Sequence, residues 1–306
     1  MIGTQAPLDE RSLALRRTAL AALVATGGGH VGGSFSAMEI LRALYDGVAT
    51  HDPADPAAPD RDRVILSKGH ACLAQYTLLA EHGYLDPAEL NTIGKRGSRL
   101  GGHPERGLVP GIECSTGALG HGLSMGLGMA LQLRRRGSTG RVYVVLGDGE
   151  LGEGSVWEAA MAASHHRLAN LCALVDLNTL QSAGPTAEIL DPGSPAARFA
   201  AFGWNTAEVP GHDTEALVRT LKAPRPDPDR PLAVICHTIK GRGLDLAENV
   251  PTWHYRIGFT EAELESLWRS LGAAPTAPAA PAAPEQNAPE QHSPAQDSPQ
   301  PQEADA

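Results

Sequence analysis

Hard oxygen ligands follow two apolar runs near the middle of the chain. The run 142–146 ends at a Gly-Asp-Gly triplet centred on Asp148, and the run 171–177 ends at Asn178. A carboxylate and an amide oxygen are ligand types that Mg²⁺ or Ca²⁺ prefers, and Mg²⁺ completes its octahedron with phosphate oxygens and water. The spacing therefore predicts a divalent cation between the ends of two neighbouring strands.

The glycines beside Asp148 favour a phosphate at the same place. Gly147 and Gly149 leave room for close approach to the backbone, and a helix that begins after them favours an anion at its start. We therefore predict a clamp in which a metal ion holds a diphosphate. The alternative is an ordinary strand-end turn of a doubly wound domain, where Asp and Gly are common turn residues.

Four histidines lie in predicted loops. His30, His70 and His103 stand in the glycine-rich segments GGGHVGG, SKGHA and GGHPE, and His254 follows Trp253. A single histidine is usually a surface residue or a satisfied core residue. Several histidines around one sheet edge instead indicate a site that binds an anion and transfers protons near neutral pH.

The apolar runs also predict the fold. Continuous β-branched runs are typical of buried parallel strands, and strand, helix and strand over 142–177 form a βαβ unit. Strands are expected at 64–66, 142–146, 171–177, 204–209 and 232–236. We expect an α/β fold, a doubly wound and mostly parallel sheet with helices on both faces, and a ligand at the carboxyl edge of the sheet.

The helices that this fold requires have recognisable starts or compositions. They are expected at 7–25, 36–48, 71–82, 155–168, 213–222 and 260–271, with a further helix that follows 115–122. Ser36 and Glu39 have the spacing of a capping box, and Arg16 falls on the polar side of the first helix. Glycines at 122, 126 and 128 predict close packing of their helix against another helix, within the chain or across a subunit contact.

Composition limits the partners and the compartment. The 306 residues are 42% hydrophobic and carry a formal net charge of −10, which argues against nucleic acid or an anionic membrane but not against small anions. The four cysteines form no C-x-x-C pair, so reduced buried thiols are expected. No leader and no apolar run of membrane-spanning length is recognised, which predicts a soluble cytoplasmic protein. Residues 1–272 are expected to form the domain, and 273–306 a flexible Pro/Ala/Gln-rich tail.

These motifs resemble those of the transketolase family. A Gly-Asp-Gly triplet followed by Asn178 looks like the thiamine-diphosphate signature, and 147–163 is similar to transketolases in particular. The resemblance extends over about residues 10–270 and includes five motifs in order. It implies the diphosphate-binding type of thiamine-diphosphate fold.

The resemblance implies a role for each motif residue. Asp148, Asn178 and the backbone carbonyl of Leu180 would hold the metal, Mg²⁺ or Ca²⁺. His70, Gly117, Leu119, Gly149, Asn178 and His254 would contact thiamine diphosphate, and Glu153 would link the two cofactor sites of a dimer. His30, His103 and His254 would contact the sugar, so the expected catalytic residues are His30, His70, His103 and His254.

Two positions depart from the family pattern. Tyr255 stands where members normally have glycine after the last histidine, which puts the role of His254 in question. His121 stands where many members have glutamine or another polar residue, and the motif assigns it no role.

The resemblance covers only the first half of a transketolase. The pyrimidine-binding domain and its glutamate have no counterpart here, so we expect a second polypeptide to supply them, most simply in an α₂β₂ assembly. The implied reaction is transfer of a two-carbon ketol unit from a ketose phosphate to an aldose phosphate. The alternatives are the α chain of a 2-oxo acid dehydrogenase, a deoxyxylulose-phosphate synthase fragment, a component of a specialised biosynthetic enzyme and a non-catalytic regulatory subunit.

Overall fold

Five parallel strands form the central sheet of this chain. The computed structural model describes residues 7–274, so most of the expected tail lies outside the described residues. The strand order is β2-β3-β4-β6-β5. The bounds are Arg63–Leu66 for β2, Val142–Gly147 for β3, Leu171–Leu177 for β4, Asn205–Pro210 for β5 and Leu232–His237 for β6. All five predicted strands are therefore present, with shifts of one residue at their ends.

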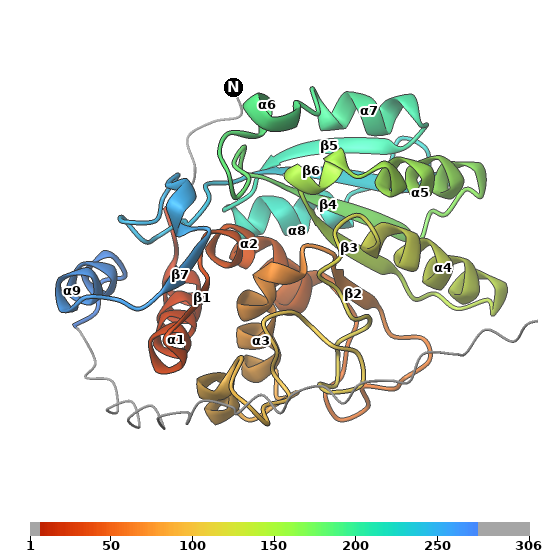
Figure 1. Ribbon diagram of the computed structural model, residues 1–306. Helices are drawn as coiled ribbons and strands as arrows, with labels where there is room; N and C mark the ends of the chain where they lie inside the picture. Colours follow the sequence, from red (N-terminus) through yellow and green to blue (C-terminus); the bar gives the residue numbers. More distant parts are fainter. Residues whose placement is uncertain (1–6, 275–306) are drawn as a thin grey trace, which may run out of the picture.

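Helices cover both faces of the sheet (Figure 1). Successive strand residues point to opposite faces. Tyr143 and Val145 of β3 belong to one buried apolar cluster, and Val142 and Val144 to a second. The first cluster includes residues of α1 (Glu10–Thr26), α2 (Gly32–Arg42), α3 (Cys72–Glu81), α8 (Thr214–Lys222) and α9 (Glu261–Ser270). The second includes residues of α4 (Gly122–Arg135), α5 (Gly154–His165) and α7 (Pro195–Ala201). The doubly wound prediction is confirmed.

Short helical turns connect these elements. They are η1 (Ala43–Val48), η2 (Gly69–Ala71), η3 (Pro87–Thr92), η4 (Gly149–Gly152), α6 (Thr186–Leu190) and η5 (Pro251–Trp253). The helices expected at 213–222 and 260–271 begin with side-chain caps. The Asp213 side chain accepts from the backbone N–H of Ala216 at the start of α8, and Thr260 and Glu263 form a capping box at the start of α9. The last predicted helix therefore begins where its sequence signal indicates.

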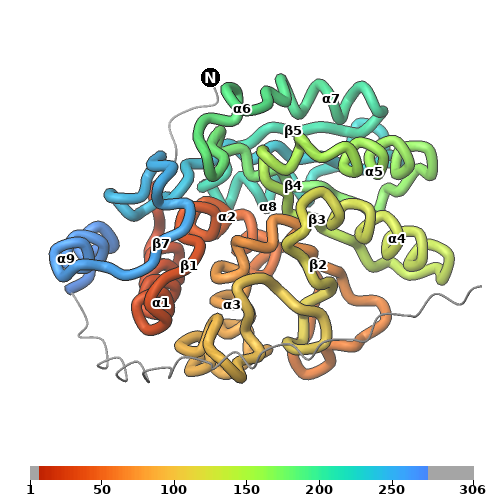
Figure 2. The backbone as a smooth tube through the Cα atoms, in the orientation of Figure 1, coloured from red at the N-terminus to blue at the C-terminus, as the bar shows by residue number. Residues whose placement is uncertain are grey.

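A second, two-stranded sheet was not predicted. β1 (Gly28–His30) pairs antiparallel with β7 (Tyr255–Ile257). Figure 2 shows the red N-terminal and blue C-terminal segments side by side at this pair. Gly28 allows the close approach, because a Cβ there would lie 2.1 Å from the carbonyl oxygen of Arg256. The glycine-rich segment was expected only as a turn, and it instead holds His30 at the end of a strand.

Two local predictions are wrong for a common reason. α2 begins at Gly32, so Ser36 and Glu39 lie inside it and form no capping box. The Ser36 hydroxyl donates to Asp176 at 2.6 Å, and Glu39 accepts from Arg16, which is fully buried and does not lie on a polar surface. Tertiary partners, rather than local capping, decide the positions of these side chains.

Two of the three glycines of α4 face the sheet and not another helix. A Cβ at Gly122 would lie 2.2 Å from the Ser67 hydroxyl oxygen, and one at Gly126 would lie 2.6 Å from a methyl carbon of Val144. Nothing lies within 4 Å of such a Cβ at Gly128. The expected helix-on-helix packing is therefore wrong at Gly122 and Gly126, which let α4 lie directly on β2 and β3.

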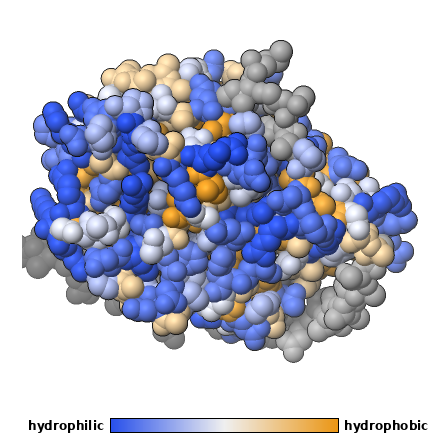
Figure 3. Space-filling view, turned by 180° about the vertical axis from the view of Figure 1, so that it is seen from behind, coloured by the Kyte–Doolittle hydropathy of each residue, from blue (hydrophilic) through white to orange (hydrophobic). Residues whose placement is uncertain are grey.

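The surface is largely hydrophilic on the face opposite that of Figure 1, where apolar residues are scattered among polar ones (Figure 3). All four cysteines are buried and free, as expected. Burial raises the pKa of the Cys72 and Cys172 thiols to about 12. In the described range 7–274, no helix combines the length and apolar character needed to cross a bilayer.

Candidate functional site

A cavity of about 330 Å³ lies at the carboxyl edge of the sheet. Its walls come from the segments that follow β1, β2, β3, β4 and β6. All eleven predicted site residues line it: His30, His70, His103, Gly117, Leu119, Asp148, Gly149, Glu153, Asn178, Leu180 and His254. The fold thus brings together motifs that are far apart in the chain.

Glycines allow the histidine-bearing loops to converge. A Cβ at Gly33 would lie 2.9 Å from the His70 ring, and one at Gly69 would lie 2.7 Å from the Thr116 hydroxyl oxygen. Gly117 has a φ of +138° and lies under the His103 ring, where an added Cβ would be 3.0 Å from Cδ2. The contacts at Gly33 and Gly69 explain why His30 and His70 occur in glycine-rich segments.

The four histidine rings form one group centred on His30. The ring of His30 lies 5.5 Å from His70, 5.6 Å from His103 and 5.5 Å from His254, measured between centroids. His70 and His254 are 5.2 Å apart. These rings surround a space in which several hydroxyl or carbonyl oxygens could be contacted at once.

Three of these imidazoles are held neutral. Burial, with help from His103 and Lys240, lowers the pKa of His30 to about 4. Burial and Lys240 lower the pKa of His254 to about 4, and burial and Lys68 lower that of His70 well below its usual range. A neutral imidazole has one donor and one acceptor nitrogen, which suits it to sugar hydroxyl groups.

Oxygen ligands lie on the opposite wall. Asp148 follows β3, and its carboxylate accepts from the backbone N–H groups of Gly149, at 2.8 Å, and Thr179. The Asn178 amide oxygen accepts from the Leu180 N–H at 3.1 Å, and the Leu180 carbonyl accepts from the Lys240 ammonium at 2.7 Å. The side chains of Asp148 and Asn178 and the Leu180 carbonyl therefore come from adjacent strand ends.

Asp148 lacks a cationic partner within ion-pair distance among residues 7–274, although it is only 3% exposed. Burial and the nearby carboxylate of Asp176 raise its pKa to about 6. Burial and Lys68 lower the pKa of Lys240 to about 8. A buried carboxylate without an ion-pair partner favours binding of a further cation.

The chemistry of this donor set fits a hard divalent ion. In the described range, no three His, Cys, Asp or Glu side chains are arranged as a metal site. The predicted set instead combines one carboxylate, one amide oxygen and one backbone carbonyl, which suits an ion that completes its shell with phosphate oxygens and water. Gly149 packs closely against Gln181, because a Cβ there would be 2.8 Å from Cγ of Gln181.

Several residues of the site were not predicted. The buried Lys68 ammonium pairs with Asp176, which also accepts from Ser36 and Thr238. Lys240 lines the cavity as well. Lys68 lies within the SKGH motif and Lys240 within the IKGRG motif, so both were next to recognised signals. Asp176 carried no signal, since it lies inside an apolar strand.

Glu150 is a further unpredicted residue that shapes the cavity. Its buried carboxylate accepts from the N–H of Gly120 at 2.8 Å, the N–H of Gly147 at 3.0 Å and the Ser67 hydroxyl. It therefore ties together the segment that carries Leu119, the end of β3 and the end of β2. Its position in the motif 147–163 gave no indication of this role.

A buried ionic network holds the loop that carries Lys240. Arg16 donates to Glu39 at 2.8 Å, and Glu39 accepts from Nδ1 of His212 at 2.7 Å. The Nε2 atom of His212 then accepts from the backbone N–H of Ile239 at 2.9 Å. Although burial alone raises the pKa of Glu39, Arg16 and His212 lower it well below its usual range.

The two departures from the family pattern have different surroundings. The Tyr255 ring lies 4.7 Å from the ring of His30 and stays 49% exposed, so it borders the histidine group without displacing His254. His121 is exposed, and its Nδ1 contacts the Leu119 carbonyl at 3.0 Å. It does not line the cavity. Glu153 is exposed at the start of α5, where its side chain lies against Gly120.

Sequence comparison shows which proteins share these motifs. Residues 9–292 match the family described as transketolase, thiamine diphosphate binding domain. An apulose-4-phosphate transketolase subunit of Phocaeicola vulgatus is 41% identical over 239 residues, which are 78% of this chain and 85% of that protein. A 6-deoxy-6-sulfo-D-fructose transketolase subunit of a Clostridium species is 38% identical over 270 residues, 88% of this chain and 96% of that protein.

Structural comparison agrees. A Pichia stipitis transketolase crystallised with sedoheptulose 7-phosphate superposes with a TM-score of 0.80 at 30% identity, over 87% of this chain and 41% of that one. The chain thus spans most of the length of the two bacterial subunits but less than half of the Pichia transketolase chain. It belongs to the transketolase family and corresponds to its N-terminal, thiamine-diphosphate-binding domain.

Proposed function

We propose that this chain is the N-terminal subunit of a split transketolase that transfers a two-carbon ketol unit from a ketose phosphate to an aldose phosphate. The observation that carries the proposal is the cavity in which four histidines face a buried, uncompensated carboxylate. Thiamine diphosphate, when bound, supplies the nucleophilic carbon and the electron sink for this chemistry. The chain supplies position, charge and hydrogen bonds.

Asp148, Asn178 and the Leu180 carbonyl would hold Mg²⁺ and, through it, the diphosphate. The Lys240 ammonium now donates to the Leu180 carbonyl, so it would turn toward the diphosphate when a metal ion takes that oxygen. His70, Gly117, Leu119 and Gly149 would contact the cofactor. The proposal includes a cytoplasmic location, where thiols such as those of this chain stay reduced.

The neutral histidines would contact the sugar. His103 and His254 each lie within 5.6 Å of the His30 ring, so together the three can orient the hydroxyl and carbonyl oxygens of a ketose. Because His30 and His254 are neutral near pH 7, each can donate one proton and accept another in hydrogen bonds without a charge change. The names of the two bacterial relatives point to different sugars, which supports a specialised donor or acceptor for this chain too.

A partner chain is required by this proposal. The described domain corresponds to less than half of the Pichia transketolase chain, and both bacterial relatives are named as transketolase subunits. We therefore expect a second polypeptide with the pyrimidine-binding domain, in an α₂β₂ assembly. The exposed Glu153 at the start of α5 would then lie at the contact between the two cofactor sites.

The decisive experiment is calorimetric titration of thiamine diphosphate with Mg²⁺ into the chain alone and with the polypeptide from the adjacent reading frame. We expect weak binding alone and tight binding together, followed by ketol transfer only in the mixture. Asp148→Ala should abolish the metal-dependent binding with unchanged circular dichroism, whereas the matched Asp213→Ala, at the start of α8, should not affect it. Ketol transfer by the chain alone would refute the split arrangement, and absence of binding in both titrations would refute the function.

A further inference from the structure

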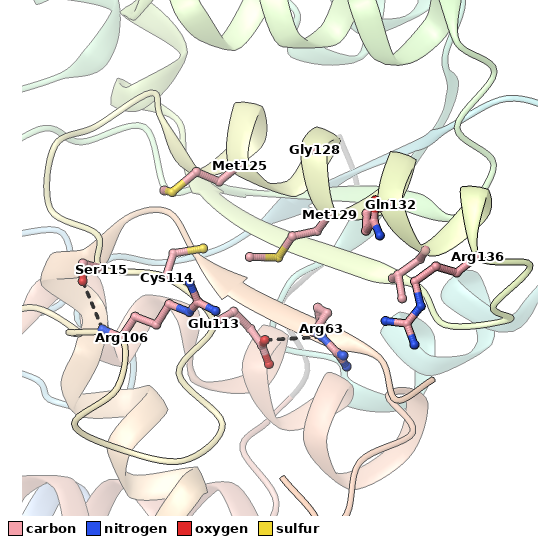
Figure 4. Close-up of a pocket in the computed structure, with 11 residues that line it drawn as sticks. Arg63, Arg106, Glu113, Cys114, Ser115, Met125, Gly128, Met129, Gln132 and Arg136 are labelled. Atoms are coloured by element: carbon pink, nitrogen blue, oxygen red, sulfur yellow. Dashed lines mark hydrogen bonds and ion pairs between the residues drawn. The ribbon is translucent and has the colours of Figure 1, made fainter. Parts of the chain in front are cut away.

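A second cavity, which shares no lining residue with the first, carries an excess of positive charge. It has a volume of about 610 Å³ and lies between α4 and the loop 103–116. Figure 4 shows Met125 and Met129 of α4 pointing into it from one side, and Arg106 and Cys114 of the loop facing them. Its walls are therefore of two kinds, sulfur-containing apolar side chains and guanidinium groups.

The arginines of this cavity are not balanced by carboxylates. Glu113 is the acidic residue among those that line it, and it is shared by Arg61, at 3.2 Å, and Arg63, at 3.5 Å. Arg106 and Arg136 are exposed and have no carboxylate within ion-pair distance in the described range 7–274. This is an unusual local charge for a chain whose formal net charge is −10.

Hydrogen bonds hold one of the arginines of this cavity in place. Arg63 donates to the backbone carbonyls of Arg61 at 2.6 Å and Ala58 at 3.2 Å, so its position is fixed by the loop before β2. Burial, Arg61 and, to a smaller extent, Arg136 lower its pKa. Arg61 and Arg136 thus repel the charge of Arg63, and an anion beside Arg63 and Arg136 would relieve that repulsion.

We propose that this cavity binds a phosphorylated small molecule with an apolar body, of the nucleotide class. The phosphates would lie on Arg106 and Arg136, because arginine forms paired charge-assisted hydrogen bonds with phosphate oxygens. The apolar body would lie on Met125 and Met129, whose flexible thioethers adapt to flat surfaces. The volume falls within the range of small-molecule sites, about 300–1,000 Å³.

The cavity shares a loop with the proposed active site. Arg106 donates its backbone N–H to the Ser115 hydroxyl at 3.0 Å, and Thr116 donates its N–H to the Pro104 carbonyl at 3.1 Å. These bonds close the loop that begins at His103 and ends beside Gly117, both of which line the first cavity. A ligand on Arg106 would therefore restrain the segment that positions His103.

The test is calorimetric titration of ADP, without metal ions, into the full chain and its variants. We expect ADP to bind more tightly than pyrophosphate, with an affinity that falls as salt is raised, and Arg106→Gln/Arg136→Gln to weaken ADP binding at least tenfold. The matched double variant Arg167→Gln/Arg219→Gln removes the same charge from two solvent-exposed helix and loop positions and should bind ADP normally. Met129→Ser should weaken ADP binding but leave pyrophosphate binding unchanged.

The first cavity is separated from this test by Lys240→Gln, which removes a cation from the lining of that cavity, and by saturating thiamine diphosphate with Mg²⁺, neither of which should reduce ADP binding. ADP binding that either of them abolishes would place the nucleotide in the first cavity and overturn the proposal. Equal binding by the two double arginine variants would also overturn it. Absence of both ADP and pyrophosphate binding would overturn it as well, and would show that the arginines serve another purpose, such as contact with an acidic segment of a partner chain.

Discussion

Replacing Asp148 with asparagine should stabilise the chain that holds no metal while it removes metal-dependent cofactor binding. Asp148 is 3% exposed, and burial together with Asp176 raises its pKa from an ordinary value of 3.8 to about 6. That difference corresponds to about 3 kcal/mol of unfavourable free energy when the carboxylate is charged in the folded protein. Asparagine removes this charge at nearly the same volume.

The stabilisation by Asp148→Asn is reduced by the loss of one hydrogen bond. The two oxygens of Asp148 accept from the N–H groups of Gly149 and Thr179. An asparagine side chain can accept only one of these, and an unpaired buried N–H costs about 1–3 kcal/mol. We therefore expect a net stabilisation of about 1 kcal/mol at pH 8, or roughly 2–3 °C in Tm.

The pH dependence is the distinctive part of this prediction. A carboxyl group with a raised folded-state pKa contributes stability that is fully present below its unfolded pKa, near 4, and is lost as pH rises through about 6. The wild type should therefore recover stability relative to Asp148→Asn on acidification. Their difference should fall by about 2 kcal/mol between pH 8 and pH 4, and the variant should become the less stable protein at the acidic end.

The assay is urea denaturation followed by circular dichroism at several pH values, without metal or cofactor. The other titrating groups, including His30 and His254, are common to both proteins and cancel in the difference. A stability difference that does not change with pH, or a variant that is less stable at pH 8, would refute the reasoning. With Mg²⁺ and thiamine diphosphate at about 100 times the Kd, the wild type alone should gain about 2.7 kcal/mol.

Asp176 gives the opposite expectation and serves as the matched control. It pairs with the buried Lys68 ammonium and accepts from Ser36 and Thr238. Although burial raises its pKa, Lys68 and these hydrogen bonds bring it below the usual value. Asp176→Asn leaves a buried cation without its partner, so it should cost about 3–5 kcal/mol near pH 7.

Three further predictions concern the frame of the site. Glu39→Gln should lower the free energy of unfolding by about 3 kcal/mol in urea denaturation, because it leaves the buried charge of Arg16 without its partner. The control Glu81→Gln, in an exposed ion pair, should lower it by less than about 1 kcal/mol. Equal losses in the two variants would contradict a stabilising role for the buried network. Gly28→Ala should separate β1 from β7 and expose the segment after Trp253 to limited proteolysis, while Gly128→Ala, in open space, should raise stability by up to about 1 kcal/mol. Because the pKa values of His30 and His254 are about 4, the activity of the assembled enzyme should show no ionisation of these groups above about pH 5 in its pH–rate profile; a step near pH 6.5 that His30→Gln removes would contradict this.

The central sheet could be predicted because each of its strands is a nearly continuous apolar run. Because β3 and β4 are covered on both faces, their sequences do not alternate between apolar and polar residues. β4 was predicted at its observed bounds. The pair β1–β7 escaped prediction because each strand has three residues, two of those in β1 are glycine, and its partner is distant in the chain. Pairing of that kind depends on the folded frame and leaves no local pattern.

Site residues could be predicted from the sequence where they stand in glycine-rich loops. They could not be predicted where their role depends on a buried ion-pair partner from elsewhere in the chain. His30 and His70 stand in glycine-rich segments because their loops must approach other parts of the site closely, and that requirement is visible in the sequence. Arg16 and Asp176 have no such mark. Arginine in an amphipathic helix and aspartate inside an apolar strand become meaningful only when Glu39 and Lys68 are found opposite them.

Asp148 and Asp176 lie at the same edge of the sheet, but one carboxylate serves the fold and the other is available to a ligand. Asp176 lies in β4 and is neutralised from within the chain by Lys68, so its charge contributes to folding. Asp148, one strand away, receives only two backbone N–H groups and is destabilised further by the charge of Asp176. A lysine in ion-pair contact with Asp148 would have relieved this repulsion, but it would also have occupied the oxygens that a metal ion needs. The charged carboxylate of Asp148 lowers the stability of the fold while no cation is bound. Binding of a cation removes this unfavourable free energy, so the same residue that destabilises the fold strengthens metal binding.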